Sequence, residues 1–131
     1  QAPYNIIDRR LADLGWLEKM YQSGIEIHIR SIFLQGLLLF NKKDRPIFFN
    51  KWSPVWEKWH KWLAELDLTA LEASLSFALD DERIAKVIVG VDGISHLQEI
   101  LSSLNTPVSD FPEELCEQDP DLIDPTHWDC L

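Results

Sequence analysis

Residues 87–99 (VIVGVDGISHLQE) constrain the fold more than any other segment of this chain. Val87, Ile88 and Val89 form a short, continuous apolar run, which predicts a strand buried on both faces, as in a parallel sheet. A glycine turn follows, and Ser95 with Gln98 predicts a capping box that opens a helix through Leu104. A strand that runs through a tight turn into a helix is a unit of an α/β fold.

Two earlier segments also predict strands. Residues 25–30 alternate strictly, with isoleucine at every odd position and a polar residue at every even one. In a barrel wrapped by helices the isoleucines would face the helices, and Arg30 would lie at the carboxyl mouth. Residues 1–7 predict the end of another strand and a turn, because Pro3 stands among apolar residues.

Helical patterns separate these strands. Residues 8–23 predict one helix whose apolar face holds Leu11, Leu14, Leu17 and Tyr21, with Gly24 as its stop. A second helix is predicted after Ser53 and Pro54, with apolar positions Val55, Trp56, Trp59, Leu63 and Leu66. Thr69 and Glu72 predict a capping box for a third, which buries Leu71, Leu75, Ala78 and Leu79. The tryptophan stripe Trp52, Trp56, Trp59 and Trp62 favours a core or interface over a sugar platform. Strands that alternate with helices indicate right-handed crossovers and a parallel sheet.

Residues 105–131 differ from the rest of the chain. They hold eight acidic residues, no lysine or arginine, and four prolines. We expect an acidic tail packed on residues 1–104, anchored by Leu115, Leu122, Ile123 and Trp128.

The formal net charge of −10 argues against nucleic acid and anionic membranes as partners. No apolar run is long enough to span a membrane, and no secretory signal is visible. Cys116 and Cys130 leave two alternatives, a disulfide or reduced thiols; a cytoplasmic protein with reduced thiols is our expectation. The four histidines are scattered without metal-ligand spacing, so no metal site is predicted.

Two places could carry chemistry. The turn from Gly90 to Gly93 precedes a helix start, where free N–H groups and the helix dipole bind anions; the alternative is an ordinary connection. Arg30 suits a phosphate or carboxylate, and its alternative is a structural ion pair with Glu26 or Asp8. No catalytic set could be assigned from the residues alone.

Taken together, these segments resemble the aldo/keto reductase family. Residues 1–5 (QAPYN) resemble the sixth strand of its barrel, and residues 24–37 (GIEIHIRSIFLQGL) resemble the seventh strand with the cofactor belt after it. Residues 87–99 resemble the eighth strand and its helix, and residues 121–128 (DLIDPTHW) are similar to the tail of one bacterial branch. The resemblance implies the C-terminal half of a (β/α)8 TIM barrel, with three parallel strands and flanking helices.

The activity implied by this resemblance is reduction of an aldehyde or ketone, in one branch a sugar-related one, by hydride transfer from NADP or NAD. Gln1 matches the glutamine that binds the nicotinamide carboxamide, and Glu99 matches a glutamate that contacts adenine. The pyrophosphate segment would be Ser31, Phe33, Gln35 and Gly36, and the adenosine-phosphate loop would be Gly90, Val91, Asp92 and Gly93.

Four positions depart from the family pattern. Arg30 replaces an aromatic residue that stacks on nicotinamide, and His96 and Ile100 change the adenine contacts. Asp92 stands where NADP-preferring members often have serine, and its charge would repel a 2′-phosphate while accepting from a 2′-hydroxyl.

The family's catalytic Asp, Tyr, Lys and His lie on earlier strands, so no catalytic residue is assigned in this chain. We therefore expect a fragment that is inactive alone and requires the N-terminal half of the barrel. The alternatives are a non-catalytic module of the same fold, which binds a nucleotide or a protein, and a truncated product with no function of its own.

Overall fold

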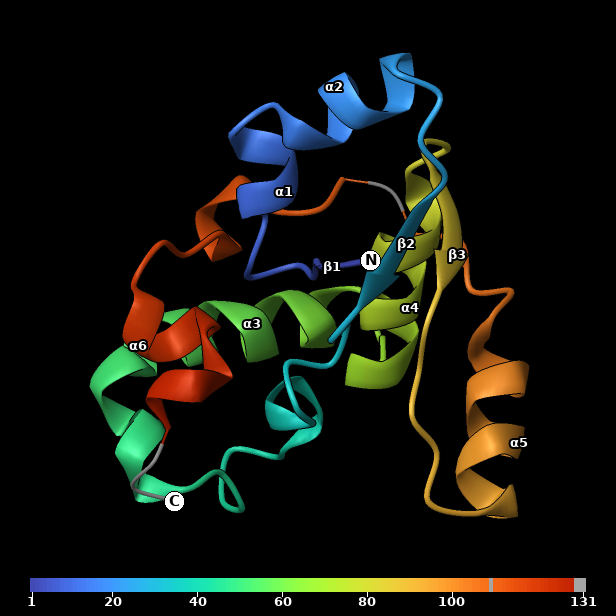
Figure 1. The fold of residues 1–131 in the computed structure, drawn as a ribbon. Coiled ribbons are helices and arrows are strands. Elements are labelled where there is room, and N and C mark those ends of the chain that lie inside the picture. Colours follow the sequence, from blue (N-terminus) through green and yellow to red (C-terminus); the bar gives the residue numbers. More distant parts are fainter. Residues whose placement is uncertain (109, 129–131) are drawn as a thin grey trace.

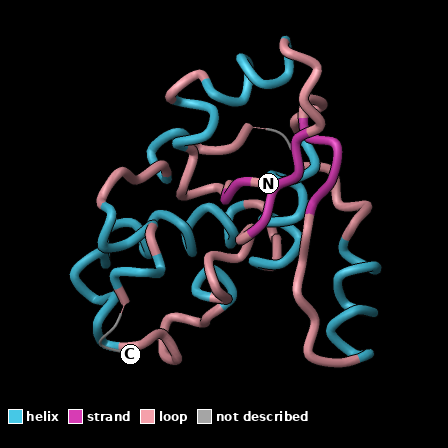
Figure 2. Tube along the Cα trace, viewed as in Figure 1, coloured by secondary structure: helices cyan, strands magenta, loops and turns pink. Residues whose placement is uncertain are grey.

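A computed structural model describes residues 1–108 and 110–128 (Figure 1). Its sheet has three strands in the order β1 (Ala2–Pro3), β2 (Ile27–Arg30) and β3 (Ile84–Val87). Both pairings are parallel, with Ala2 opposite Ile29 and Ile29 opposite Val87. The predicted parallel sheet with flanking helices is therefore confirmed, and each strand pair is joined through helices (Figure 2).

The position of the third strand differs from the prediction. Of the apolar run, only Val87 belongs to β3, and Lys86 and Ile88 are exposed. The expected burial on both faces is wrong, because β3 pairs with β2 alone and is an edge strand among the described residues. In β2 the predicted buried row of isoleucines is confirmed for Ile27 and Ile29. Ile25 precedes the strand and is exposed.

The helix predicted at residues 8–23 is two helices, α1 (Arg10–Asp13) and α2 (Trp16–Gln22). Gly15, at φ 74°, separates them in a left-handed conformation that suits glycine. The break rotates the apolar stripe out of register: Leu17 is fully buried, whereas Leu14 and Tyr21 are exposed. Gly24 ends α2 as predicted, at φ 73°.

Two long helices hold most of the core. α3 (Ser53–Glu65) buries Trp56, Trp59 and Leu63, so the tryptophan stripe is core as expected, although Leu66 is exposed. α4 (Ala70–Asp80) begins with the predicted capping box: the Thr69 side chain accepts from the Glu72 N–H, and Glu72 accepts from the Thr69 N–H. Of its predicted core positions, Leu75 and Ala78 are buried, Leu71 is partly buried and Leu79 is exposed.

α5 (Ile94–Ser103) follows β3 and is the last helix before the acidic tail (Figure 1). The predicted Ser95–Gln98 capping box is wrong. α5 begins two residues earlier, at Ile94 after Gly93, and no side chain caps it.

The acidic tail packs on the rest of the chain. It contains a short 3₁₀ helix (Glu113–Leu115), then α6 (Pro120–Ile123) and a second 3₁₀ helix (Pro125–His127). Its predicted anchors Leu115, Leu122 and Ile123 are buried, and Trp128 is partly buried. The Trp52 Nε1 donates to Asp119 at 2.9 Å, which ties the tail to the start of α3.

Of the two cysteines, Cys116 is half-buried, and its thiol donates to Asp13; burial raises its pKa to about 11. Cys130 lies outside the described residues. None of the helices in residues 1–108 and 110–128 has the length and apolar character needed to cross a membrane.

Candidate functional site

The carboxyl ends of the three strands lie at the same end of the sheet. Pairing continues past the strands themselves, because the Tyr4 N–H donates to the Arg30 carbonyl (3.2 Å) and the Ile88 N–H donates to the Ile29 carbonyl (2.8 Å). A cavity of about 300 Å³ lies here, bounded by Arg30 and the belt after it on one side and by Gly90 on the other. Arg30 and the glycine turn therefore share one mouth of the sheet.

The Arg30 guanidinium is exposed at this mouth and donates to the Ser31 hydroxyl at 3.1 Å. Neither of the carboxylates suggested as structural partners contacts it. Glu26 pairs instead with His28 and Lys86, and Asp8 pairs with Arg10 at 2.8 Å. The ion-pair alternative is thus not formed, and within the described residues the guanidinium donates only to Ser31.

The belt after β2, residues 31–36, has an unusual backbone. Ser31, Leu34, Gln35 and Gly36 all have positive φ, at 59°, 47°, 54° and 84°. Non-glycine residues rarely adopt this conformation, and such strain gathers at ligand sites. Within the described chain, the N–H groups of Phe33, Gln35 and Gly36 meet no protein acceptor. Successive free N–H groups in a curled backbone form a concavity suited to an anion.

The start of α5 offers a second set of donors. Leu97 is the first residue whose N–H bonds back, to the Gly93 carbonyl at 3.2 Å, so the three preceding amides are free of helical partners. A Cβ atom added at Gly90 or Gly93 would meet no atom within 4 Å, and neither residue needs a left-handed backbone. The turn is therefore open to close approach by a ligand.

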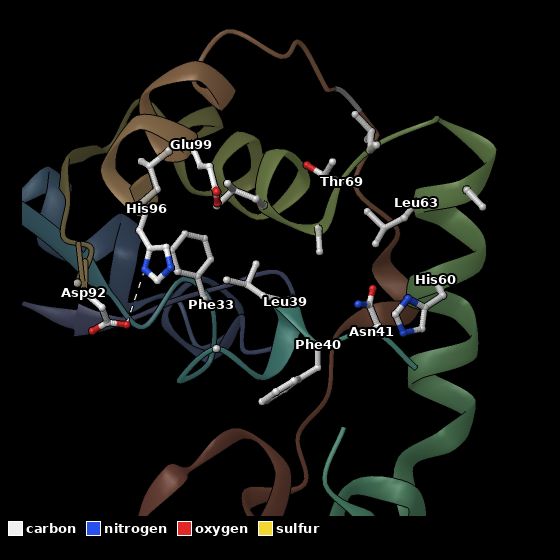
Figure 3. Close-up of a pocket in the computed structure, with 17 residues that line it drawn as sticks. Phe33, Leu39, Phe40, Asn41, His60, Leu63, Thr69, Asp92, His96 and Glu99 are labelled. Carbon is white, nitrogen blue, oxygen red and sulfur yellow. Dashed lines mark ion pairs between the residues drawn. The ribbon is translucent and has the colours of Figure 1, made fainter. Parts of the chain in front are cut away.

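A larger cavity of about 730 Å³ connects the belt with α5 (Figure 3). One wall carries His96 and Glu99 of α5, and the opposite wall carries His60 and Leu63 of α3. Phe33, Leu39 and Phe40 cover the apolar side between them. Volumes of 300–1,000 Å³ with a mainly apolar lining are typical of small-molecule sites.

Charge in this cavity is unevenly placed. The Asp92 carboxylate, 97% exposed, lies 3.8 Å from the His96 imidazole one helical turn later. Across the cavity, burial together with the nearby Arg45 and Lys42 lowers the pKa of His60, so this imidazole is neutral near neutral pH.

Most of the predicted cofactor residues converge on these two cavities. The smaller one is lined by Arg30, Ser31, Phe33, Gln35 and Gly90, and the larger one by Phe33, Gly36, Gly90, Asp92, His96 and Glu99. Gln1, Val91 and Gly93 line neither of them. Gln1 is exposed just before β1, two residues ahead of Pro3, which pairs with Arg30.

The sequence reasoning missed Asn41, His60 and Thr69, which line the larger cavity. His60 was discoverable in part, because it lies one turn from both Trp56 and Leu63 on the apolar side of α3. Asn41 and Thr69 are in connections, where no periodic pattern marks the side chains that face a cavity.

The two tyrosines give little support for acid–base chemistry within this segment. Tyr4 is buried, with its ring centre 5.1 Å from the ring centre of Phe77, and burial raises its pKa to about 12. Tyr21 is exposed on α2 and lines neither cavity. Among the described residues, no group of three or more His, Cys, Asp or Glu side chains could hold a metal ion.

Parallel βα units with a shared mouth define an α/β protein with a candidate ligand site at the carboxyl ends of its strands. The family model described as aldo/keto reductase matches residues 1–115, and the chain belongs to this family of oxidoreductases. No curated protein and no solved structure matches the chain.

Proposed function

We propose that this chain is the cofactor-binding, C-terminal part of an NAD(P)H-dependent aldo/keto reductase that reduces an aldehyde or ketone. Its strands would be the sixth, seventh and eighth of a (β/α)8 barrel, with residues 105–131 as the tail. The catalytic Asp, Tyr, Lys and His would come from the other strands. A sugar-related carbonyl compound is the substrate class suggested by the tail.

One observation carries the proposal: Arg30, the strained belt and the glycine turn lie at one mouth and border adjoining cavities. In eight-stranded α/β barrels this face holds the active site, and the loops after the last two strands often bind phosphate. Gly90 and Phe33 line both cavities, so an elongated ligand could occupy the two together.

The residues present fit a dinucleotide. The free amides of Phe33, Gln35 and Gly36 could donate to a pyrophosphate, and the open α5 start could receive an adenosine phosphate. Glu99 and the apolar wall at Leu39 would border the adenine, while Arg30 would lie over or beside the nicotinamide. When bound, NAD(P)H would supply the hydride.

Arg30 has a second possible task at the reacting end. A guanidinium is planar, always charged and able to donate in pairs. It could therefore hold an acid group of the substrate as well as cover the nicotinamide face. The two tasks predict different effects of Arg30→Lys. Lysine keeps the positive charge that holds an acid group, but it lacks the planar guanidinium that covers the nicotinamide.

The test is binding and turnover by the full-length protein. We expect NADPH or NADH to quench tryptophan fluorescence saturably and to support reduction of a test aldehyde. Arg30→Ala and Gly93→Ala should weaken that quenching. Failure of both dinucleotides to bind would overturn the proposal.

The remaining alternative is a non-catalytic module of the same fold. Binding of dinucleotide without turnover of any aldehyde or ketone would favour it, as would absence of the Tyr, Asp, Lys and His set from the other strand ends. Turnover that is lost when that tyrosine is replaced would favour the reductase.

A further inference from the structure

Arg45, in the connection before α3, carries a buried charge that nothing in the proposed function uses. Only 8% of this residue is exposed. Its guanidinium lies 4.2 Å from the centre of the Trp56 ring, in a cation–π contact. Its Nη2 donates to the Phe40 carbonyl at 3.3 Å and to the His60 Nε2 at 3.0 Å.

No carboxylate compensates this charge among the described residues. The buried Nε of Arg45 has no acceptor, and Nη1 donates to none in the described chain. Arg10 and Arg83, by contrast, are held by Asp8 and Asp81. A buried cation without a paired anion is costly, and an orphaned buried donor calls for a partner.

His60 cannot be that partner. A guanidinium only donates, so the His60 Nε2 must accept and the ring proton must lie on Nδ1. The imidazole is then neutral and brings no negative charge. Burial lowers the pKa of both Arg45 and His60, because it disfavours their charged forms.

Beside Arg45 lies a third cavity, of about 220 Å³, where the polar groups of Lys42 and Asn50 stand beside the apolar Trp56 ring. Lys42 and Asn50 contribute donors, and His60 lines both this cavity and the larger one (Figure 3 shows His60 beside Asn41). Lys42 forms no ion pair within the described part of the chain. Glu57 also lines the cavity, and within the described residues it forms no ion pair with Arg45 or Lys42.

We propose that this cavity is a binding site for a small oxyanion, a phosphate or carboxylate group, held by Arg45 and Lys42. The occupant supplies the negative charge that Arg45 lacks, and the side-chain amide of Asn50 completes its hydrogen bonds. A cavity of about 220 Å³ has room for roughly seven waters at about 30 Å³ each, so it can hold a phosphate or carboxylate group. The site is separate from the dinucleotide cavities and does not depend on the proposed function.

The experiment is isothermal titration calorimetry on the full-length protein with inorganic phosphate, sulfate, acetate and, as reference, chloride at constant ionic strength. We expect saturable binding of phosphate or acetate that chloride does not reproduce. Phosphate binding tighter than acetate assigns a phosphate group, and the reverse assigns a carboxylate. Saturating NADPH should leave the anion affinity unchanged.

Variants test which residues hold the anion. Lys42→Gln, at an exposed position, should weaken binding at least threefold, and Glu57→Gln should strengthen it by removing a like charge. Arg45→Gln should abolish binding, with circular dichroism to check folding. The control is Lys58→Gln, an exposed α3 lysine outside the cavity, which should change nothing. Binding no stronger than chloride, or unchanged by both Lys42→Gln and Glu57→Gln, would overturn the site.

Discussion

The Ile88 N–H donates to the Ile29 carbonyl at 2.8 Å, one residue beyond the end of β3. This bond keeps β3 aligned with β2 until both strands reach the same edge of the sheet. Arg30 follows Ile29 directly, and Gly90 comes two residues after Ile88. The two segments that the sequence marked as functional are therefore held side by side by backbone pairing, before any side chain contributes.

Arg30→Ala should weaken NAD(P)H binding about ten- to a hundredfold in the full-length protein. A hydrogen bond from a charged donor is worth about 1.5–3 kcal/mol, and about 1.4 kcal/mol corresponds to a factor of ten. Stability should hardly change, because the Arg30 side chain is exposed and donates only to its neighbour Ser31. Fluorescence quenching gives the affinity, and thermal unfolding gives the stability.

Arg30→Lys and Lys58→Ala complete that series. If the guanidinium lies flat on the nicotinamide, lysine should not restore the affinity. Lys58 is exposed on α3 and lines none of the cavities described above, so its removal controls for the change in net charge. Equal losses in Arg30→Ala and Lys58→Ala would contradict a specific contact.

Asp92→Ser should improve NADPH affinity relative to NADH. The Asp92 carboxylate is almost fully exposed beside His96, so its effect on a 2′-phosphate would be electrostatic. Removing one unit charge about 4 Å away in water changes the free energy by about 1 kcal/mol, or roughly fivefold in affinity. The effect should shrink as salt rises. Asp80→Ser, at an exposed position at the end of α4, is the control, and an unchanged NADPH-to-NADH ratio would remove the charge argument.

Two glycines should respond oppositely to alanine. Gly36→Ala should cost about 1–2 kcal/mol of unfolding free energy, because φ is 84° there and an L side chain is strained in the left-handed region. Gly93→Ala should cost little, since its backbone is extended and a Cβ would meet no atom within 4 Å. It should instead reduce dinucleotide affinity by occupying the space beside the turn. Chemical denaturation and quenching measured on both variants check this, and a large stability loss in Gly93→Ala would contradict it.

Features set by local chemistry could be predicted from the sequence. The Thr69–Glu72 capping box and the stop at Gly24 depend on residues a few positions apart, and both are present. The parallel sheet followed from the order of strand and helix patterns. The placement of Arg30 followed from the alternation of residues 25–30.

What depends on long-range packing could not be predicted in this way. The break at Gly15 has a local cause, a glycine at φ 74°, but which side chains it leaves exposed, such as Leu14, depends on how α1 and α2 pack. The apolar run at 87–89 predicted a strand buried on both faces. Whether it is buried depends on which other elements cover β3, and the run itself does not specify them. The Arg45–His60 contact joins a connection to a helix fifteen residues later, and no spacing rule marks it.

The ion pair between Asp81 and Arg83 should make stability depend on acid. Arg83 donates to Asp81 at 2.8 and 2.6 Å and also to Glu18 on α2, so it ties the start of β3 to that helix. These hydrogen bonds hold the pKa of Asp81 below its ordinary value of 3.8. Because the folded pKa is the lower one, the stabilisation is complete above 3.8 and is lost as the pH falls through the folded pKa.

Asp81→Asn should therefore be less stable than the wild type at neutral pH, and the difference should vanish in strong acid. Urea unfolding measured at several pH values checks this, with Asp80→Asn as the matched neighbour. A difference between Asp81→Asn and the wild type that stays constant down to the lowest pH would show that the charge of Asp81 is not the cause.

Residues 1–131 expressed alone should aggregate or associate through strand edges. Among the described residues, β1 and β3 each pair on one side only, which leaves two open edges, and three parallel strands cannot close a barrel. Exposed apolar side chains lie beside β1 (Leu14), before β2 (Ile25), after β3 (Ile88) and on α5 (Ile94 and Leu101). In the proposed barrel, the neighbouring strands and helices would cover them. Light scattering and analytical ultracentrifugation of residues 1–131, with the full-length protein as control, test this. A cooperative melt of a monomeric 131-residue chain would contradict both the instability and the need for the rest of the barrel.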